Sequence, residues 1–502
     1  MPRDNKRVAT SLLLTRGRGE AREVFLVERS PKLRFFGGFW AFPGGVVDAE
    51  DRHAPDEDEN TVLSRCGLRE LFEETGILLG GIGSDWSDEQ RQRLRIDLSQ
   101  REPSAEGKTQ WRRAIEAVEP EALELVRPLC RITTPPFAPV RYQTHFLHAE
   151  LPDDARPEVV DGELVRGEMI RPAEALRSWR AGERLIAPPV LFLLQLFAEH
   201  DLPELFEAAA RETQALADGK LHPVLFVPGI FMAPLATPTL PPATTTNCFL
   251  VGGERQYVVD PATYEPEEQQ RLFDKMDEVI ASGARFEGVL VTHHHPDHVG
   301  AVAAVSRRYD LPVLAHPITL ERLPESVAET RPLNDGDTLD LGTAPDGTKG
   351  WTLKAIHTPG HDRGHLCFVE SRYRAALVGD MMSTVSTIVI DPPEGHLQTY
   401  LDSLNRLLEE PLEMVHPAHG PAHREGHALI RHYLSHRQAR EDALAAALND
   451  EPRSIEDLVS DVYSDVDSRL YPLAVRSLLA GLHKLRDEGR ALEQGERWTA
   501  CR

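Results

Sequence analysis

The sequence of 502 residues is poor in cysteine, in aromatic residues and in long apolar runs. Its five cysteines, Cys66, Cys130, Cys248, Cys367 and Cys501, form no Cys-x-x-Cys pair, which argues against a disulfide framework and against thiolate zinc sites. The apolar run SLLL near the start is shorter than the core of a signal peptide, and proline or charge breaks the later runs. We therefore expect a soluble cytoplasmic protein with no membrane partner, in which any metal is held by histidine and carboxylate side chains.

Positive charge is also scarce. Lysine and arginine number 56 against 80 aspartate and glutamate residues, a formal net charge of −24, which opposes general attraction to nucleic acid. Aromatic residues make up 6% of the chain and offer few surfaces on which bases could stack. Nucleic acid is therefore not favoured as a partner. The hydrophobic fraction of 41% is typical of globular domains, and the length suggests two to four of them.

Patterning divides the chain into four parts. Residues 1–216 alternate apolar strands with helical stretches, and a new alternation runs from 247 to about 435 within a second domain placed at 222–435, so both parts are expected to be layered α/β domains. Between them, the segment 217–245 holds six prolines, which favours an extended connector over a helix. Residues 436–502 follow the order helix, helix, helix, hairpin, which is typical of a winged helix. The expected fold class is multidomain α/β.

In the first part, the segment RELFEETGI places three carboxylates on one face of a predicted helix. Glu70, Glu73 and Glu74 stand at positions i, i+3 and i+4. Their mutual repulsion costs helix stability unless cations lie between them, and oxygen ligands of this kind suit Mg²⁺ or Mn²⁺. Taken alone, such a cluster is typical of a solvated acidic face. Upstream, however, Gly44 and Gly45 allow the backbone to approach a ligand closely.

These residues resemble the Nudix box, in which a glycine is followed by a glutamate and then by Arg-Glu-apolar-x-Glu-Glu-x-Gly-apolar. Here 18 residues separate Glu50 from Arg69, an insertion of 11 relative to the box, so the match at Glu50 stays open. Further upstream, Arg29, Arg34 and the glycines that follow them resemble the additional motif of the coenzyme A diphosphatase branch.

The resemblance implies a Nudix α/β/α fold that hydrolyses nucleoside-diphosphate-linked compounds, such as CoA or its derivatives, with Mg²⁺ or Mn²⁺. It assigns metal binding and catalysis to Glu70, Glu73 and Glu74. The Gly44 carbonyl is expected near the metal, and Gly44 and Gly45 are expected to bind the ligand through a close backbone approach. Arg29 and Arg34 suit bidentate contacts with phosphate groups, although arginines near a strand end are equally typical of the surface. Arg69 is expected to orient a glutamate. The general base is not identified.

In the second part, the apolar strand GVLVT leads directly into HHHPDH, residues 293–298. Four histidines and an aspartate in six residues would repel one another if protonated and have no packing value, which favours a metal site. Three later segments place His361, Asp380 and His419 at strand ends, where each alone is weak evidence. Together with His-x-His-x-Asp-His, these residues resemble the metallo-β-lactamase superfamily of αββα hydrolases.

The resemblance implies a dinuclear centre. One metal would be held by His293, His295 and His361, and the second by Asp297, His298 and His419, with Asp380 as the bridge and with Asp297 and Asp380 as catalytic residues. A water shared by two such ions is acidified and becomes a hydroxide nucleophile. Neutral imidazole favours two Zn²⁺, and Fe or Mn also suits this number of oxygen ligands. His294, His365 and His416 are left unassigned, as loop positions or partners of a ligand.

Within the superfamily, the resemblance is nearest to lactamase-beta-like proteins that end in a winged helix, some of which are endoribonucleases acting on single-stranded RNA. Glyoxalase II-like thioester hydrolases share the ligand set. Residues 436–502 carry 10 basic and 13 acidic side chains, so the tail lacks the basic surface of a nucleic-acid reader. We expect it to pack against the hydrolase domain, near the mouth of the site or at a homodimer contact.

We therefore favour a bifunctional hydrolase whose substrates are a small-molecule diphosphate for the first half and an ester or thioester for the second. The alternative is an endoribonuclease in which the Nudix half binds a nucleotide end. A third interpretation makes one half an idle binding or regulatory module, which the full ligand sets in both halves disfavour.

Overall fold

The computed structural model describes residues 6–33, 36–138, 140–160, 162–323, 327 and 329–501. These residues form two compact units, and each is described by itself: the first comprises residues 1–135 and 140–226, and the second residues 136–139 and 227–502.

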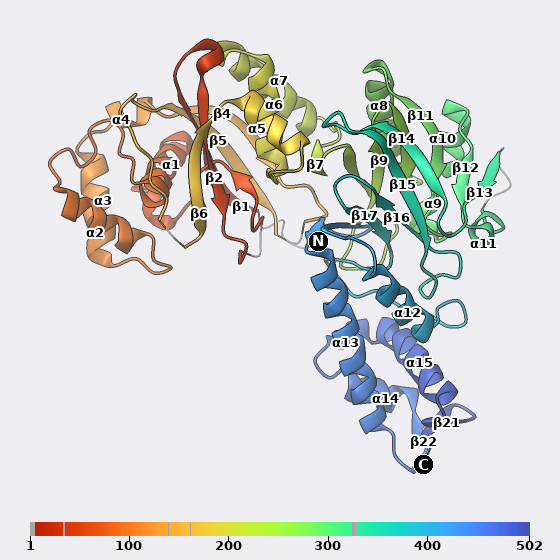
Figure 1. The fold of residues 1–502 in the computed structure, drawn as a ribbon. Helices are drawn as coiled ribbons and strands as arrows, with labels where there is room; N and C mark the ends of the chain where they lie inside the picture. Colours follow the sequence, from red (N-terminus) through yellow and green to blue (C-terminus); the bar gives the residue numbers. More distant parts are fainter. Residues whose placement is uncertain are drawn as a thin grey trace. The chain divides into compact units, whose positions relative to one another are not determined.

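The first unit is built around a six-stranded mixed sheet in the order β3-β2-β1-β5-β4, with β6 paired to β2 (Figure 1). Its strands are β1 (Arg7–Arg16), β2 (Glu23–Arg29), β3 (Trp40–Ala41), β4 (Arg127–Thr133), β5 (Tyr142–Glu150) and β6 (Leu164–Ile170). The central pair, β1 and β5, runs parallel. In β1, consecutive residues Leu12, Leu13 and Leu14 are all buried, as expected of a central strand that is covered on both faces.

Seven helices are described in this unit: α1 (Glu59–Thr75), α2 (Asp88–Leu98), α3 (Ala105–Glu116), α4 (Glu121–Glu124), α5 (Pro172–Arg180), α6 (Pro188–Glu199) and α7 (Leu202–Ala217). The helix that carries the three glutamates is α1. It begins after Asp58, whose side chain accepts a hydrogen bond from Thr61 N, and it ends at Gly76 in the left-handed conformation. Leu68, Leu71 and Phe72 of α1 pack against Leu12 and Phe25 of the sheet, which fixes the orientation of the helix.

The second unit contains two large sheets. The seven-stranded sheet has the order β13-β12-β11-β10-β9-β8-β7 and consists of β7 (Val224–Val227), β8 (Ile230–Ala236), β9 (Thr245–Gly252), β10 (Arg255–Val259), β11 (Arg285–Leu290), β12 (Val313–Ala315) and β13 (Thr330–Pro332). The six-stranded sheet has the order β14-β15-β16-β17-β18-β19 and consists of β14 (Thr338–Thr343), β15 (Lys349–His357), β16 (Leu366–Glu370), β17 (Ala375–Gly379), β18 (Met414–Pro417) and β19 (His423–Arg424).

Helices cover these sheets: α8 (Pro266–Ala281), α9 (Pro296–Val299), α10 (Val302–Tyr309), α11 (Pro317–Leu320), α12 (Leu397–Leu407) and α13 (Gly426–Ala447). Figure 1 shows α8 and α10 beside β11 of the seven-stranded sheet, with which both are in contact. On the six-stranded sheet, Tyr400 and Leu404 of α12 and Ile430 of α13 pack against Ile356 and Val378. The arrangement is the expected αββα sandwich.

The structure differs from the expected connector at 217–245. This segment contains β7 and β8, which are strands of the seven-stranded sheet, and Pro234 lies within β8 opposite Asn247. The apolar runs VLFV and IFMAPLA are almost entirely buried, so the burial of these side chains outweighs the proline content.

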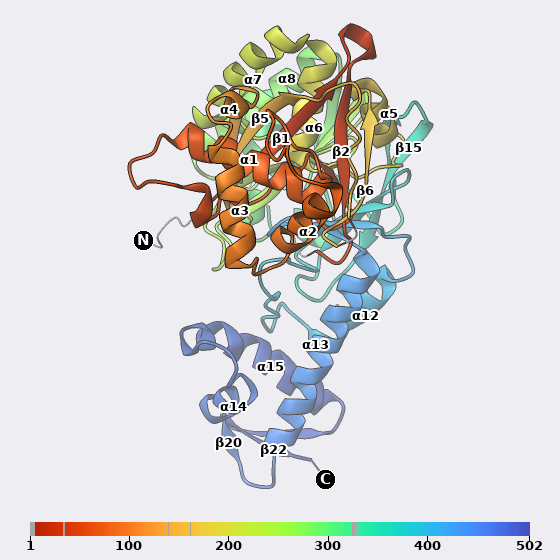
Figure 2. The same cartoon turned by 90° about the vertical axis from the view of Figure 1, so that its left-hand side faces the viewer.

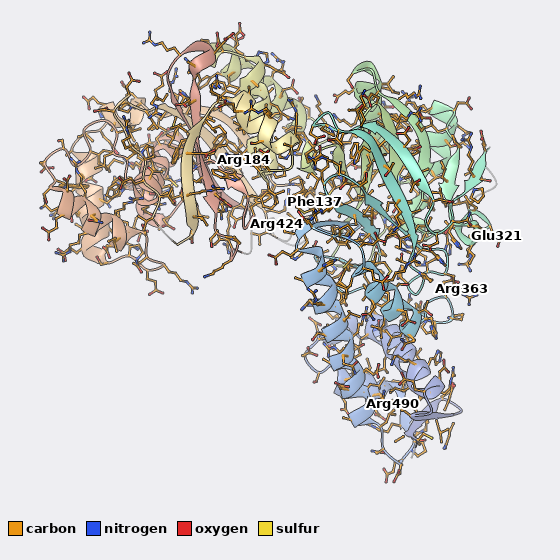
Figure 3. All side chains as sticks on the ribbon, viewed as in Figure 1. Phe137, Arg184, Glu321, Arg363, Arg424 and Arg490 are labelled. Carbon is orange, nitrogen blue, oxygen red and sulfur yellow. The ribbon has the colours of Figure 1, made fainter. Side chains whose placement is uncertain are left out.

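The tail continues from α13 with β20 (Arg453–Ser454), α14 (Ile455–Val462), η3 (Ser468–Leu470), α15 (Tyr471–Asp487), β21 (Ala491–Gln494) and β22 (Arg497–Ala500). Figure 2 shows α13 running from α12 towards β22, so this helix crosses the expected boundary at 435. In Figure 3, Arg490 marks the turn after α15, where its Nη1 donates a 2.6 Å hydrogen bond to Glu441 Oε1 of α13. Among the described residues, no helix is long and apolar enough to cross a membrane.

Candidate functional site

In the first unit, Arg69 of α1 links three carboxylates. Its Nε and Nη2 donate hydrogen bonds of 2.9 Å to the two oxygens of Asp51. Its Nη1 donates to Glu70 Oε1 at 2.9 Å and to Glu73 Oε1 at 3.1 Å. Because the guanidinium fork is rigid, Arg69 fixes the directions of both glutamates.

The acid that reaches Arg69 is Asp51 and not Glu50. Glu50 lies on the exposed side of the short helix η2 (Ala49–Asp51) and pairs with Lys108 Nζ at 2.6 Å. Asp51 is 3% exposed. Sequence reasoning missed Asp51 because the insertion after Glu50 removes the spacing that identifies the partner of the arginine.

The glycines before α1 pack against the acidic face itself. Gly44 N donates a 2.8 Å hydrogen bond to Glu74 Oε2. A Cβ atom at Gly45 would collide with the Glu70 carboxylate, and one at Gly44 would collide with Thr10 O. Glycine is therefore required at position 44 for the turn to approach β1 this closely, and glycine at position 45 leaves room for the Glu70 carboxylate.

The three glutamates are held in an environment that disfavours their charge. Burial raises the pKa of Glu70 and of Glu74, and it raises the pKa of Glu73 to about 8 against the opposing effect of Arg69. A divalent cation would relieve this cost, so the donor set fits the Mg²⁺ or Mn²⁺ expected from sequence. The carboxylate oxygens of the three glutamates do not lie as close together as the ligands of a formed metal site. Among the described residues, groups of three His, Cys, Asp or Glu ligand atoms within 4.8 Å of one another occur only in the second unit.

The positive charge of Arg29, at the end of β2, acts on this acidic face, because it opposes the rise in the pKa of Glu74. Its Nε is buried and has no hydrogen-bond partner among the described residues. Arg34, the other arginine expected to bind phosphate, lies outside the residues that the structure describes.

In the second unit, three histidine nitrogens converge. His295 Nδ1 lies 3.0 Å from His293 Nε2 and 3.0 Å from His361 Nε2. His293 and His295 follow β11, and His361 follows β15. His361 Nδ1 donates a 2.9 Å hydrogen bond to Val389 O, so the lone pair of His361 is on Nε2, which faces the other two rings.

The second group of ligands lies beside the first. Asp297, His298 and His419 bring their ligating atoms within 4.8 Å of one another. His298 Nδ1 lies 2.9 Å from Asp260 Oδ2, and His419 Nδ1 donates to Thr245 O at 3.1 Å. Because these acceptors hold the protons of both Nδ1 atoms, both Nε2 atoms point into the site.

Asp380, at the end of β17, lies between the two groups. Its Oδ1 is 3.4 Å from His419 Nε2 and 3.6 Å from His298 Nε2, while its Oδ2 is 3.5 Å from His361 Nε2. His298 Nε2 and Asp380 Oδ1 are buried without a hydrogen-bond partner among the described residues. Since buried polar atoms are rarely left unpaired, these atoms fit a site that binds metal ions.

The electrostatics of the site separate the two groups. Burial and the neighbouring rings lower the pKa of His293, and they lower that of His295 to about 4, so both rings are neutral, as metal binding would require. Burial alone would also lower the pKa of His298 and His419, but the Asp380 carboxylate raises both.

Sequence reasoning missed two residues that position these ligands. Asp260, directly after β10, accepts hydrogen bonds from Thr292 N at 2.8 Å and Thr292 Oγ1 at 2.6 Å in addition to its contact with His298. His365 Nε2 accepts a 3.1 Å hydrogen bond from Asp380 N. Asp260 carries the same signal that identified Asp380, an aspartate directly after an apolar strand. His365 was named but left unassigned.

The remaining two histidines have other contacts. His294 Nδ1 lies 2.6 Å from Asp362 Oδ2, beside the first group of ligands. His416 is buried edge-on against Phe249, with ring centroids 5.9 Å apart, so it is a core residue.

Comparison with known families agrees with this division. The NUDIX domain model matches residues 5–129, the metallo-beta-lactamase superfamily model matches residues 241–419, and the beta-lactamase associated winged helix domain model matches residues 454–498. The chain joins a NUDIX domain to a metallo-beta-lactamase domain with its winged helix. It is therefore a hydrolase, and the expected multidomain α/β fold class is confirmed. All seven ligands predicted for the second site lie within 241–419.

Each of the similar proteins covers up to about half of this chain. An atrochrysone carboxyl ACP thioesterase of Aspergillus novofumigatus is 27% identical over 259 residues, which are 49% of this chain and 74% of the relative. The beta-lactamase-like protein 2 homolog of Drosophila melanogaster is 25% identical over 49% of this chain and 83% of its own length. A crystal structure of a NUDIX hydrolase from Alicyclobacillus acidocaldarius is 25% identical over 41% of this chain and 97% of that chain, with a TM-score of 0.34.

Proposed function

We propose that the second unit hydrolyses an ester or thioester at a dinuclear metal centre. The observation that supports this proposal most directly is the position of Asp380. Its Oδ1 lies 3.4 Å from His419 Nε2 of the second group, and its Oδ2 lies 3.5 Å from His361 Nε2 of the first group. When bound, two divalent ions would acidify a shared water and polarise the substrate carbonyl. Zn²⁺ suits the five histidines, and Fe or Mn remains compatible with the aspartates.

The protein's own residues prepare this centre. Val389 O, Asp260 and Thr245 O each accept the Nδ1 hydrogen of one histidine and fix its ring orientation, so three Nε2 atoms are directed into the site before metal binds. His365 fixes the backbone at Asp380 and thereby the bridging carboxylate. Preorganisation of this kind lowers the cost of assembling the site.

Charge supports a small substrate over RNA. A net charge of −24 opposes the phosphate contacts from which RNA binding draws most of its affinity. The relative of Aspergillus novofumigatus is named a thioesterase, which also favours a thioester for this chain.

For the first unit, we propose hydrolysis of nucleoside-diphosphate-linked compounds such as CoA, with Mg²⁺ or Mn²⁺ held by Glu70, Glu73 and Glu74. Bound cations would neutralise the diphosphate oxygens and position a water for attack on phosphorus. Arg69 orients Glu70 and Glu73, and the buried unpaired Nε of Arg29 suits a phosphate oxygen.

The test is an assay of the full-length protein with an acyl thioester, with CoA and with labelled single-stranded RNA, in the presence of Zn²⁺, Mn²⁺ or Mg²⁺. Asp380→Asn is expected to abolish thioester hydrolysis and to spare CoA hydrolysis, while Glu73→Gln is expected to do the reverse. RNA cleavage that is lost in Asp380→Asn, without thioester hydrolysis, would overturn the ester or thioester assignment in favour of an endoribonuclease.

A further inference from the structure

The segment between Asp380 and α12, residues 381–396, lies against a predicted metal ligand. We call this segment the metal-site loop. Its Val389 carbonyl accepts the 2.9 Å hydrogen bond from His361 Nδ1 that directs His361 Nε2 into the site. The position of this carbonyl therefore decides the direction of His361.

Helix α13 also contacts the metal-site loop, at the residue next to the one that binds His361. Arg437 of α13 is 7% exposed, and its Nη2 donates a hydrogen bond to Ile388 O, the carbonyl directly before that of Val389. The Arg437 guanidinium also lies over the ring of Tyr400, 5.3 Å from its centroid, and Tyr400 OH donates to Met381 O at 2.7 Å.

A second residue of α13 fixes the start of the same loop. Tyr433 OH accepts a 2.8 Å hydrogen bond from Ser383 N and lies 3.0 Å from Ser386 O. The tail adds two ion pairs to the end of the loop, Arg476 with Asp391 at 3.2 Å and Asp487 with His396 at 3.9 Å. These ion pairs are exposed and contribute little to holding the loop in place. The buried contacts from α13 therefore provide most of the restraint on the metal-site loop.

Helix α13 is also where the two halves of this unit join. Ile430 and Tyr433 belong to the core of the hydrolase sandwich, while Leu444 belongs to the core of the tail. The helix lies between the segments matched by the two family models, 241–419 and 454–498, and neither match includes Arg437.

We propose that Arg437 is a positioning residue for the metal ligand His361, and that the winged-helix tail supports the metal centre through α13. Because the peptide unit is planar, fixing the Ile388 carbonyl also fixes the amide of Val389, so that only the φ and ψ angles of Val389 remain to set the direction of its carbonyl. The inference rests on the proposed dinuclear centre, of which His361 is a ligand. It gives the tail a role at the metal site that requires no contact with nucleic acid.

The test uses Co²⁺ as the probe and the full-length protein. Arg437→Met keeps an apolar side chain of similar reach and removes the donor. It is expected to weaken Co²⁺ binding about tenfold, as measured by competition with a chelator, because partners that orient a ligand typically contribute this much. It should also change the visible absorption spectrum of the Co²⁺ protein, whereas Arg437→Lys should restore part of the affinity.

The matched control is Arg440→Met on the same helix, which loses a pair with Asp465 and a hydrogen bond to Val462 O inside the tail. It should bind Co²⁺ as the wild type does. Equal Co²⁺ affinity and spectra for wild type and Arg437→Met would overturn the inference, as would an equal loss in Arg440→Met. Absence of Co²⁺ binding by the wild type would overturn the dinuclear centre itself.

A third variant covers the case in which Arg437→Met does not fold. Tyr433→Phe removes one α13 hydroxyl that contacts the same loop and leaves the core packing in place. It should weaken Co²⁺ binding in the same direction, and unchanged affinity in this variant would then overturn the inference.

Discussion

Asp51 and Arg69 form a buried bidentate ion pair in which Arg69 Nε and Nη2 each lie 2.9 Å from one carboxylate oxygen. The same guanidinium contacts Glu70 and Glu73 through Nη1. Asp51, an acid from the inserted segment, therefore fixes the position of Arg69, and Arg69 in turn orients two of the predicted metal-binding glutamates.

Asp51→Asn should reduce CoA hydrolysis with Mg²⁺ about tenfold to a hundredfold, because misplaced ligands weaken metal sites by this factor. It should also lower stability by about 3 kcal/mol, since Arg69 is left buried without its main partner. Glu50→Gln, which changes the adjacent exposed acid, should behave as the wild type. Kinetics and thermal unfolding of both variants check this, and an equal loss in Glu50→Gln would contradict it.

Glu74→Gln should lower the rate of CoA hydrolysis by about 10²-fold or more, because it removes a charge that stabilises the metal and the developing negative charge. Folding should be little affected, since burial already raises the pKa of Glu74 and the amide keeps the shape of the side chain. Steady-state kinetics with Mg²⁺ and Mn²⁺ test this. Wild-type turnover by the variant would remove Glu74 from the site.

Asp260→Asn should weaken metal binding at the second site by about tenfold to a hundredfold, because Asp260 orients His298 without being a predicted ligand itself. Asp277→Asn is the matched control, since Asp277 pairs with Arg308 at 3.0 Å on the surface of the same unit. Zn²⁺ affinities measured by chelator competition should differ between the two variants. If they agree, Asp260 has no role in holding the metal.

The stability of the first unit should fall in acid partly because of His148. Burial, with the Arg127 cation, lowers the pKa of His148 to about 3 from its ordinary 6.5. Above pH 6.5 the unfolded and folded states are both neutral at this residue. As the pH falls from 6.5 towards 3, only the unfolded state gains the proton, so stability is lost at up to about 1.4 kcal/mol per pH unit.

Thermal unfolding between pH 7 and pH 4 should therefore show a weaker pH dependence in His148→Gln than in the wild type. His200→Gln, at the end of α6, serves as the control. An unchanged pH dependence in His148→Gln would show that this histidine does not contribute.

The convergence of the predicted ligands of the second site could be predicted from sequence because these residues follow apolar strands. His293 to His298 lie in six consecutive residues after β11, and Asp380 follows β17 directly. Strand ends of a sandwich meet at one edge, so ligand types at these positions converge whatever the intervening loops contain.

Other features depend on tertiary contacts that no local pattern reports. Asp51 could not be identified because it lies in the insertion, where the spacing of the box no longer points to the partner of Arg69. The proline content of 217–245 masked β7 and β8, which the burial of their apolar runs stabilises. Arg437 lies on a helix with no recognisable motif, and only the packing of α13 places it beside Ile388.

We propose that the second unit holds a dinuclear centre that works separately from the NUDIX site. The most direct measurement is the number of transition-metal ions bound per full-length chain in a Glu74→Gln background, which weakens the first site, together with thioester hydrolysis. We expect the Glu74→Gln protein to bind two ions per chain and to hydrolyse the thioester. Adding Asp380→Asn should lower the number of bound ions and abolish this hydrolysis. Fewer than one ion per chain in the Glu74→Gln protein, or thioester hydrolysis that survives Asp380→Asn, would contradict it.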